Sequence, residues 1–217
     1  LVNKDSALFI LDQEKTNIYM DTFLNNQIGR TSPILKNRGW NVLLDATDSY
    51  IKFKRNVLGY VSWGATDDSG KIAPFRGAPA CKWLPSSIAS FYYSYTARTF
   101  IKSKSGSGYE LCGSAEREGC KGIMGPTYEP WSFAMPDPTI YFERYTDESQ
   151  PIHFNLAESF YASAPSYSWM MVVVGDPKSS IISKMPSKPE VNVDTITKVC
   201  QYSNRIVKTS GNVTGNM

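Results

Sequence analysis

Short apolar runs recur along the chain and are separated by polar stretches rich in Gly, Pro, Asn, Asp and Ser. β-branched and aromatic residues dominate these runs, and such residues favour β-strands. The predicted strands are residues 7–11, 40–44, 50–54, 57–63, 91–101, 139–145, 152–156, 169–174, 191–199 and 205–208. Many short strands with frequent turn signals between them are typical of a β-sandwich or barrel.

The clearest alternation of apolar and polar positions lies in residues 139–145. Ile140 and Phe142 alternate there with Tyr141 and Glu143. A period of two is expected of a strand that buries one face and exposes the other. The pattern therefore favours antiparallel sheets packed face to face.

Helices and loops take a smaller part of the prediction. One short helix is expected over residues 17–27, and dense Pro and Gly predict long surface loops over residues 70–85 and 119–138. We therefore predict a mainly β fold: an antiparallel β-sandwich, immunoglobulin-like or jelly-roll, with long loops, one or two short helices and two disulfides. It would form one binding domain over residues 1–207, followed by a polar tail or linker over residues 208–217.

Composition and charge narrow the possible partners. The 217 residues are 41% hydrophobic and 20% charged, which is ordinary for a globular domain with one core. The net charge of +3 comes from 23 basic and 20 acidic residues that are interspersed, so we expect no nucleic-acid partner. The longest apolar run, residues 169–174, is far shorter than the roughly 20 residues of a membrane-spanning helix. The first residues lack signal-peptide features, which indicates a processed or trimmed chain.

The number and spacing of the four cysteines indicate whether the protein folds in an oxidising or a reducing compartment. Their spacing matches no CxxC zinc or redox motif, and an even number favours two disulfides. The polar stretch between Cys112 and Cys120 would close a tight loop, which leaves Cys81 to pair with Cys200. Each bond would contribute about 2–4 kcal/mol. Disulfides imply a secreted or cell-surface protein, and the alternative is four reduced cysteines in the cytosol.

Signatures of catalysis are scarce. The chain has one histidine, His153, and it lacks GxSxG, Walker A, GxGxxG and HExxH motifs. We therefore expect no enzyme activity, no cofactor and no metal site. A glycoside hydrolase needs only two opposed carboxylates, and the candidates for that alternative are Glu143, Glu148 and Glu158.

Aromatic residues are plentiful: five Trp, thirteen Tyr and ten Phe, several of them in or beside the predicted loops. Such side chains stack on sugars or anchor interfaces, and basic neighbours would suit an anionic glycan. The predicted ligand-binding residues are Trp83, Tyr93, Tyr95, Tyr128, Glu129, Trp131, Arg117 and Lys121. The alternative is that the tryptophans cap the ends of a sandwich and that the basic residues are ordinary surface charges.

In outline, this layout resembles the receptor-binding lectin domains at the tips of bacterial fimbriae, and the likeness is one of layout, not of a motif. The resemblance implies an adhesin that recognises a host glycan or glycoprotein through a shallow pocket built from loops. It also implies a pilin domain following the polar tail. Two alternatives stay open, a secreted toxin or toxin subunit and a secreted glycoside hydrolase.

Overall fold

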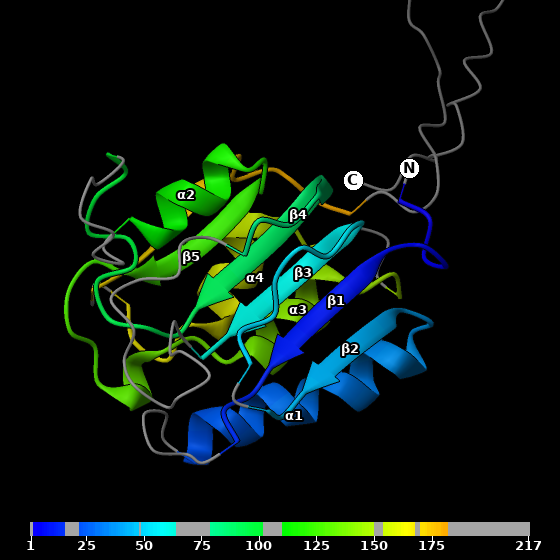
Figure 1. The fold of residues 1–217 in the computed structure, drawn as a ribbon, viewed down its shortest axis with the longest axis horizontal. Helices are drawn as coiled ribbons and strands as arrows, with labels where there is room; N and C mark the ends of the chain where they lie inside the picture. The colour runs from blue at the N-terminus through cyan, green and yellow to red at the C-terminus, as the bar shows by residue number, and fades with distance from the viewer. Residues whose placement is uncertain are drawn as a thin grey trace, which may run out of the picture.

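The computed structural model describes residues 2–15, 22–47, 49–63, 79–101, 110–149, 154–167 and 170–181. Within these residues six strands form one sheet in the order β2-β1-β3-β4-β5-β6 (Figure 1). The strands are β1 (Leu8–Asp12), β2 (Asn41–Asp45), β3 (Val57–Ser62), β4 (Trp83–Phe91), β5 (Gly122–Pro126) and β6 (Met171–Gly175). The first five are parallel, and β6 pairs antiparallel with β5.

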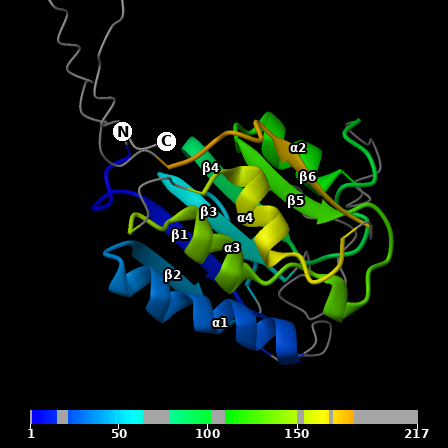
Figure 2. The ribbon, with the colours of Figure 1, turned by 180° about the vertical axis from the view of Figure 1, so that it is seen from behind.

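Helices cover both faces of the sheet. The described helices are α1 (Thr22–Asn37), α2 (Leu111–Arg117), the 3-10 helix η1 (Ser132–Ala134), α3 (Pro138–Tyr145) and α4 (Leu156–Ser163). Figure 2 shows α1, α3 and α4 side by side on one face, while α2 lies on the other face. None of the helices in the described ranges has the length and apolar character needed to cross a bilayer.

Local sequence explains where the helices begin. The Asp137 side chain accepts a hydrogen bond from the Thr139 N–H at 2.8 Å, and Pro138 occupies the first turn of α3. Asn155 and Glu158 form a reciprocal capping box at the start of α4, with distances of 2.9 and 3.0 Å. Both helices therefore carry start signals in their sequences.

The strands separate two apolar cores. Phe9 and Leu11 of β1 pack toward α1, α3 and α4, while Ile10 packs on the opposite face, because successive side chains of a strand alternate. Gly59 of β3 lies against the Phe9 ring, where any Cβ would collide with it. Phe9 also makes an edge-on contact with Phe142 of α3 at 5.4 Å between ring centroids. These contacts fix α3 over the centre of the sheet.

A strap, residues 49–56, crosses the face of the sheet opposite α1. Because β2 and β3 are parallel, the chain after β2 must return to the other end of the sheet before β3 begins. On its way, the Tyr50 ring contacts the Tyr60 ring of β3 at 6.4 Å and belongs to the core on the α2 face. The strap therefore forms the crossover connection between the parallel strands β2 and β3, a connection that is usually a helix.

The predicted antiparallel β-sandwich is wrong: the fold is a mixed α/β sheet with helices on both faces. Strands were predicted correctly at β1, β2, β3 and β6. Residues 139–145, however, form helix α3, residues 50–54 belong to the strap, and of residues 91–101 only Phe91 lies in a strand. The predicted strands 191–199 and 205–208 lie outside the described residues.

The boundaries of the other predicted elements also change. The helix expected over residues 17–27 is α1, which continues to Asn37. The loop expected over residues 119–138 contains the whole of β5, and the one over residues 70–85 ends inside β4. Both missed strands contain turn-forming residues, Gly122, Gly125 and Pro126 in β5 and Pro85 followed by two serines in β4, so composition alone did not separate them from loops.

The predicted disulfide between Cys112 and Cys120 is also wrong. Both residues, and Cys81, are free and buried thiols. The segment that was expected to close a tight loop instead forms most of α2, and a helix extends the chain by about 1.5 Å per residue. Cys200, the predicted partner of Cys81, lies outside the described residues.

Candidate functional site

The carboxyl ends of β1 and β3 meet at the point where the chain changes direction across the sheet. After β1 the chain moves outward to β2, and it then returns past β1 to β3. Open parallel sheets bind their ligands outside the carboxyl ends of the strands at such a switch point. Asp12 is the last residue of β1, and Ser62 is the last residue of β3.

The Asp12 carboxyl is completely buried at this point. Its Oδ2 atom accepts hydrogen bonds from the Ser62 hydroxyl at 3.0 Å and from the Ile51 N–H at 3.3 Å. Its Oδ1 atom has no hydrogen-bond partner among the described residues. Burying a carboxyl oxygen that accepts no hydrogen bond costs free energy, so packing alone does not account for an aspartate at this position.

Burial raises the pKa of Asp12 from 3.8 to about 7. The Ile51 N–H and the Ser62 hydroxyl lower the pKa, the charge of Asp45 raises it further, and the Trp63 side chain lowers it slightly. Desolvation is the largest of these effects because the charged form loses its hydration. Near neutral pH the carboxyl can therefore either hold or release a proton.

Two buried tyrosines close the site on the strap side. The Tyr60 hydroxyl donates a hydrogen bond to the Ile51 carbonyl at 2.9 Å. Burial raises the pKa of both Tyr50 and Tyr60 well above 10, so both phenols are neutral. Ile51 is thus held through its N–H by Asp12 and through its carbonyl by Tyr60.

The chain immediately after Asp12 is fixed to α1 by a side-chain clamp. Asn25 accepts a hydrogen bond from the Glu14 N–H at 3.0 Å and donates one to the Glu14 carbonyl at 2.6 Å. The Gln13 amide donates to the Asn25 carbonyl at 2.7 Å. The carboxyl end of β1 is therefore held rigidly on both faces of the sheet.

A surface hollow of about 520 Å³ lies beside this end of β1. It is lined by Gln13, Phe23, Asn26, Gly29 and Arg30. A methyl group at Gly29 would lie 2.8 Å from the Gln13 amide nitrogen, so the glycine allows that side chain to approach the helix. The lining combines a cation, two amides and an aromatic ring, which suits a small ligand with a negative and an apolar part.

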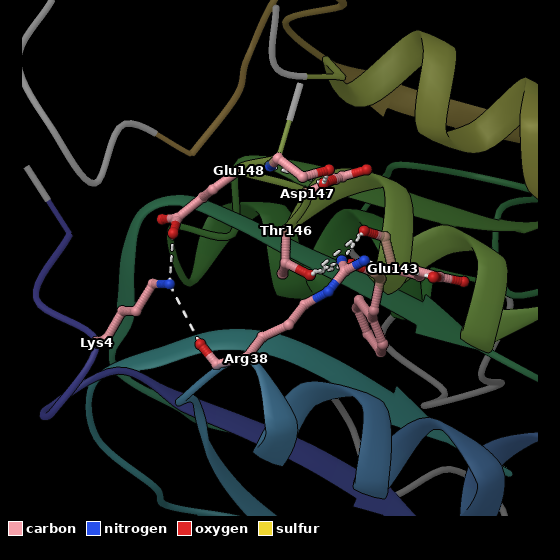
Figure 3. Close-up of polar contacts among 8 residues, drawn as sticks. Lys4, Arg38, Glu143, Thr146, Asp147 and Glu148 are labelled. Atoms are coloured by element: carbon pink, nitrogen blue, oxygen red, sulfur yellow. Dashed lines mark hydrogen bonds and ion pairs between the residues drawn. The ribbon is translucent and has the colours of Figure 1, made fainter. Parts of the chain in front are cut away.

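A second polar cluster lies at the opposite end of the sheet (Figure 3). Lys4 pairs with Glu148 at 2.6 Å and donates to the Arg38 carbonyl at 3.2 Å. The Arg38 guanidinium contacts Thr146 at 3.0 Å and Glu143 at 3.4 Å. Each cation has a partner, so the cluster joins the start of the chain to the ends of α1 and α3 and is structural.

This cluster bears on the carboxylates considered for a glycoside hydrolase. Glu143 and Glu148 belong to it, and Glu158 completes the capping box of α4. Each carboxylate thus has a structural contact in the described chain.

Part of the predicted aromatic site comes together at the carboxyl ends of β4 and β5. The Tyr95 and Tyr128 rings meet edge-on at 5.2 Å, and Glu129 accepts a hydrogen bond from the Ser94 hydroxyl at 2.5 Å. Trp131 is 67% exposed nearby in the sequence, and half-buried Tyr93 follows β4. A binding role for these residues stays a prediction.

The other predicted binding residues lie elsewhere. Trp83 begins β4 at the opposite edge of the sheet, where its indole N–H donates to Glu118 at 3.4 Å. Arg117 ends α2 and donates to the Phe100 carbonyl at 2.8 Å, and exposed Lys121 directly precedes β5. The two predicted aromatic clusters are thus split between opposite ends of the strands, and Cys81 anchors neither by a disulfide within the described chain.

Neither Asp12 nor the hollow was among the residues predicted from the sequence to form a site. The signal for Asp12 was present, because Asp12 and Asp45 each directly follow an apolar run. In a parallel sheet such residues lie together at the carboxyl edge. Arg30 carried no local signal, since only the packing of α1 beside β1 places it there.

Comparison with protein-family models, with curated proteins and with solved structures finds no match to this chain. Within the described residues, no group of three or more His, Cys, Asp or Glu side chains is arranged to hold a metal ion. The resemblance to fimbrial lectins loses its basis, because it depended on a disulfide-braced β-sandwich. The carboxyl edge of the sheet is therefore the candidate site in the described chain.

Proposed function

We propose that the protein binds a small organic anion in the hollow at the carboxyl end of β1. The observation that carries the proposal is Arg30, which places a positive charge in the lining of this hollow. The hollow lies at the end of the sheet where open α/β folds bind their ligands. Its size also falls within the range of about 300–1,000 Å³ that is usual for small-molecule sites.

Within the part of the chain that the structure describes, the guanidinium of Arg30 makes one weak contact. Its Nη2 atom lies 4.0 Å from Asp137, and its side chain is 62% exposed. Asp137 already accepts hydrogen bonds from Gln27 at 3.1 Å and from the Thr139 N–H at 2.8 Å. Exposed ion pairs of this kind contribute little, so Arg30 keeps donors for a bidentate contact with a carboxylate or phosphate.

The remaining lining residues define the rest of the ligand. Phe23 is 55% exposed and offers an aromatic surface beside the cation. The amides of Gln13 and Asn26 supply further polar contacts around the hollow. We therefore expect an anion attached to an aromatic or apolar group.

Isothermal titration calorimetry with phenyl phosphate and benzoate tests the proposal, with benzyl alcohol as the neutral analogue. The wild type should bind the two anions and not the alcohol. Arg30→Gln should weaken binding about tenfold or more, because a charge-assisted hydrogen bond contributes about 1.5–3 kcal/mol. Lys36→Gln is the matched control, since it removes the same charge from the last turn of α1 outside the hollow. Equal affinity in wild type and Arg30→Gln would overturn the proposal.

A further inference from the structure

We infer that the hollow takes N-acylated amino acids, the chemistry found at the carboxyl terminus of a peptide: Arg30 binds the carboxylate, Gln13 accepts a hydrogen bond from the amide N–H, and Phe23 contacts the apolar acyl group. This inference rests on the proposed function, because it takes the anion-binding role of Arg30 as given. It adds the part of the ligand that lies between the anion and the apolar group.

Three of the lining residues follow one another along a single face of α1. Phe23, Asn26 and Arg30 are spaced by three and four positions, which places them on one side of a helix. Phe23 and Arg30 therefore lie about 10 Å apart along the helix axis. An anion bonded directly to an aromatic ring is shorter than this distance, so a ligand that contacts both residues at once carries a spacer between its two ends.

The Gln13 side chain lies beside the middle of this face, and the orientation of its amide is fixed. Its Nε2 atom donates to the Asn25 carbonyl at 2.7 Å, and a Cβ on Gly29 would lie 2.8 Å from the same atom. Because only the NH₂ group of the amide can donate to a carbonyl, the Oε1 atom faces away from that contact. Oε1 accepts no hydrogen bond from the described residues. The hollow therefore offers a fixed acceptor between its apolar end and its cationic end.

The polar groups of the lining match an amide. Asn26 is exposed, and its NH₂ group can donate to a carbonyl oxygen while Gln13 accepts from an N–H. A free α-ammonium group would instead lie close to the Arg30 guanidinium, and no carboxylate is among the described residues that line the hollow. Repulsion between the two cations disfavours a free amino acid and favours one whose nitrogen is acylated.

A pair of ligands that differ in one group tests the inference. Hippurate, which is N-benzoylglycine, carries a ring, an amide and a carboxylate in this order, and benzoyloxyacetate has an ester oxygen in place of the N–H. In calorimetric titrations the wild type should bind hippurate about three- to tenfold more tightly than the ester, because the ester lacks one hydrogen bond. Gln13→Leu removes the acceptor, so it should bind the two ligands with equal affinity. Arg30→Gln should weaken the binding of both.

A second variant keeps the test valid if Gln13→Leu does not fold. In Gly29→Ala the new methyl group would displace the Gln13 amide and leave Arg30 and Phe23 in place, so the preference for hippurate should fall. Lys36→Gln, in the last turn of α1 outside the hollow, is the matched control and should keep the full preference.

A peptide separates the two sources of this ligand chemistry. Tighter binding of acetyl-Ala-Phe-Gly than of hippurate supports a site for the carboxyl terminus of a peptide, and weaker binding supports one for a small N-acylated amino acid. Equal affinity of the wild type for hippurate and benzoyloxyacetate would overturn this inference and leave the proposed function standing. A preference that persists in both Gln13→Leu and Gly29→Ala would also overturn it. If neither hippurate nor benzoate binds, the proposed function fails as well.

Discussion

Asp12→Asn should remove a large part of the pH dependence of the free energy of unfolding. Asparagine has nearly the same volume and keeps an oxygen that can accept hydrogen bonds from Ser62 and Ile51. It differs from aspartate in that it cannot ionise. The comparison therefore isolates the cost of the buried charge.

The sign and size of the effect follow from the two pKa values of Asp12. The folded-state pKa of about 7 lies above the unfolded value of 3.8, so the folded protein binds more protons between these limits. The stability contributed by this group is complete below about pH 4 and is lost as pH rises to about 7. At about 1.36 kcal/mol per pKa unit, the rise corresponds to about 4 kcal/mol.

Urea unfolding of both proteins at several pH values between 4 and 8 measures this difference. The unfolding free energy of Asp12→Asn minus that of the wild type should increase by about 4 kcal/mol over the range, because the other titrating groups cancel. Asp5→Asn, a replacement at an exposed position, controls for exchanging a carboxyl for an amide on the surface. Parallel pH profiles for Asp12→Asn and wild type would refute the reasoning.

Two further predictions concern the cores. Gly59→Ala should lower the free energy of unfolding, measured by urea denaturation, by about 1–3 kcal/mol, because its Cβ would overlap the Phe9 ring. Gly29→Ala is the control, since its Cβ would meet the flexible amide of Gln13. Equal effects of the two substitutions would contradict the packing described for Gly59. Cys81, Cys112 and Cys120 should react slowly with iodoacetamide at pH 8 and rapidly in denaturant, since burial raises their pKa values to about 11, 12 and 12. Mass spectrometry quantifies the labelling, and similar native and denatured rates would show that the thiols are not buried.

The positions of several strands were readable from the sequence, but their pairing was not. β1, β2, β3 and β6 coincide with apolar runs, and such runs mark buried strands whatever their neighbours. Parallel or antiparallel pairing depends on what covers the sheet, and this in turn depends on recognising the helices. With α3 predicted as a strand and most of α4 assigned to no element, a sandwich was the consistent result.

Two start signals would have identified these helices. Asp137-Pro138 and the pair Asn155 with Glu158 are helix-start patterns that can be read without a structure. Within residues 139–145, the buried residues Tyr141, Phe142 and Tyr145 lie on one face of a helix, although the same segment also reads as a strand. Short segments satisfy both periods, and the caps decide between them.

The carboxyl edge differs from the rest of the described surface in how its charges are satisfied. At the amino edge Lys4 and Arg38 each meet a carboxylate or carbonyl, as expected of a cluster that only joins elements (Figure 3). Among the described residues, Asp12 at the carboxyl edge is buried without a counter-charge, and the ion-pair partner of Arg30 lies 4.0 Å away. An apolar residue at position 12 would avoid the cost, and proteins commonly give up stability where a site must act. The Asp12 carboxyl and the Arg30 guanidinium thus lie on opposite faces of the sheet at the end of β1, and each lacks close partners of opposite charge among the described residues. These two groups favour a functional site there, and not in the aromatic loops that the sequence first suggested.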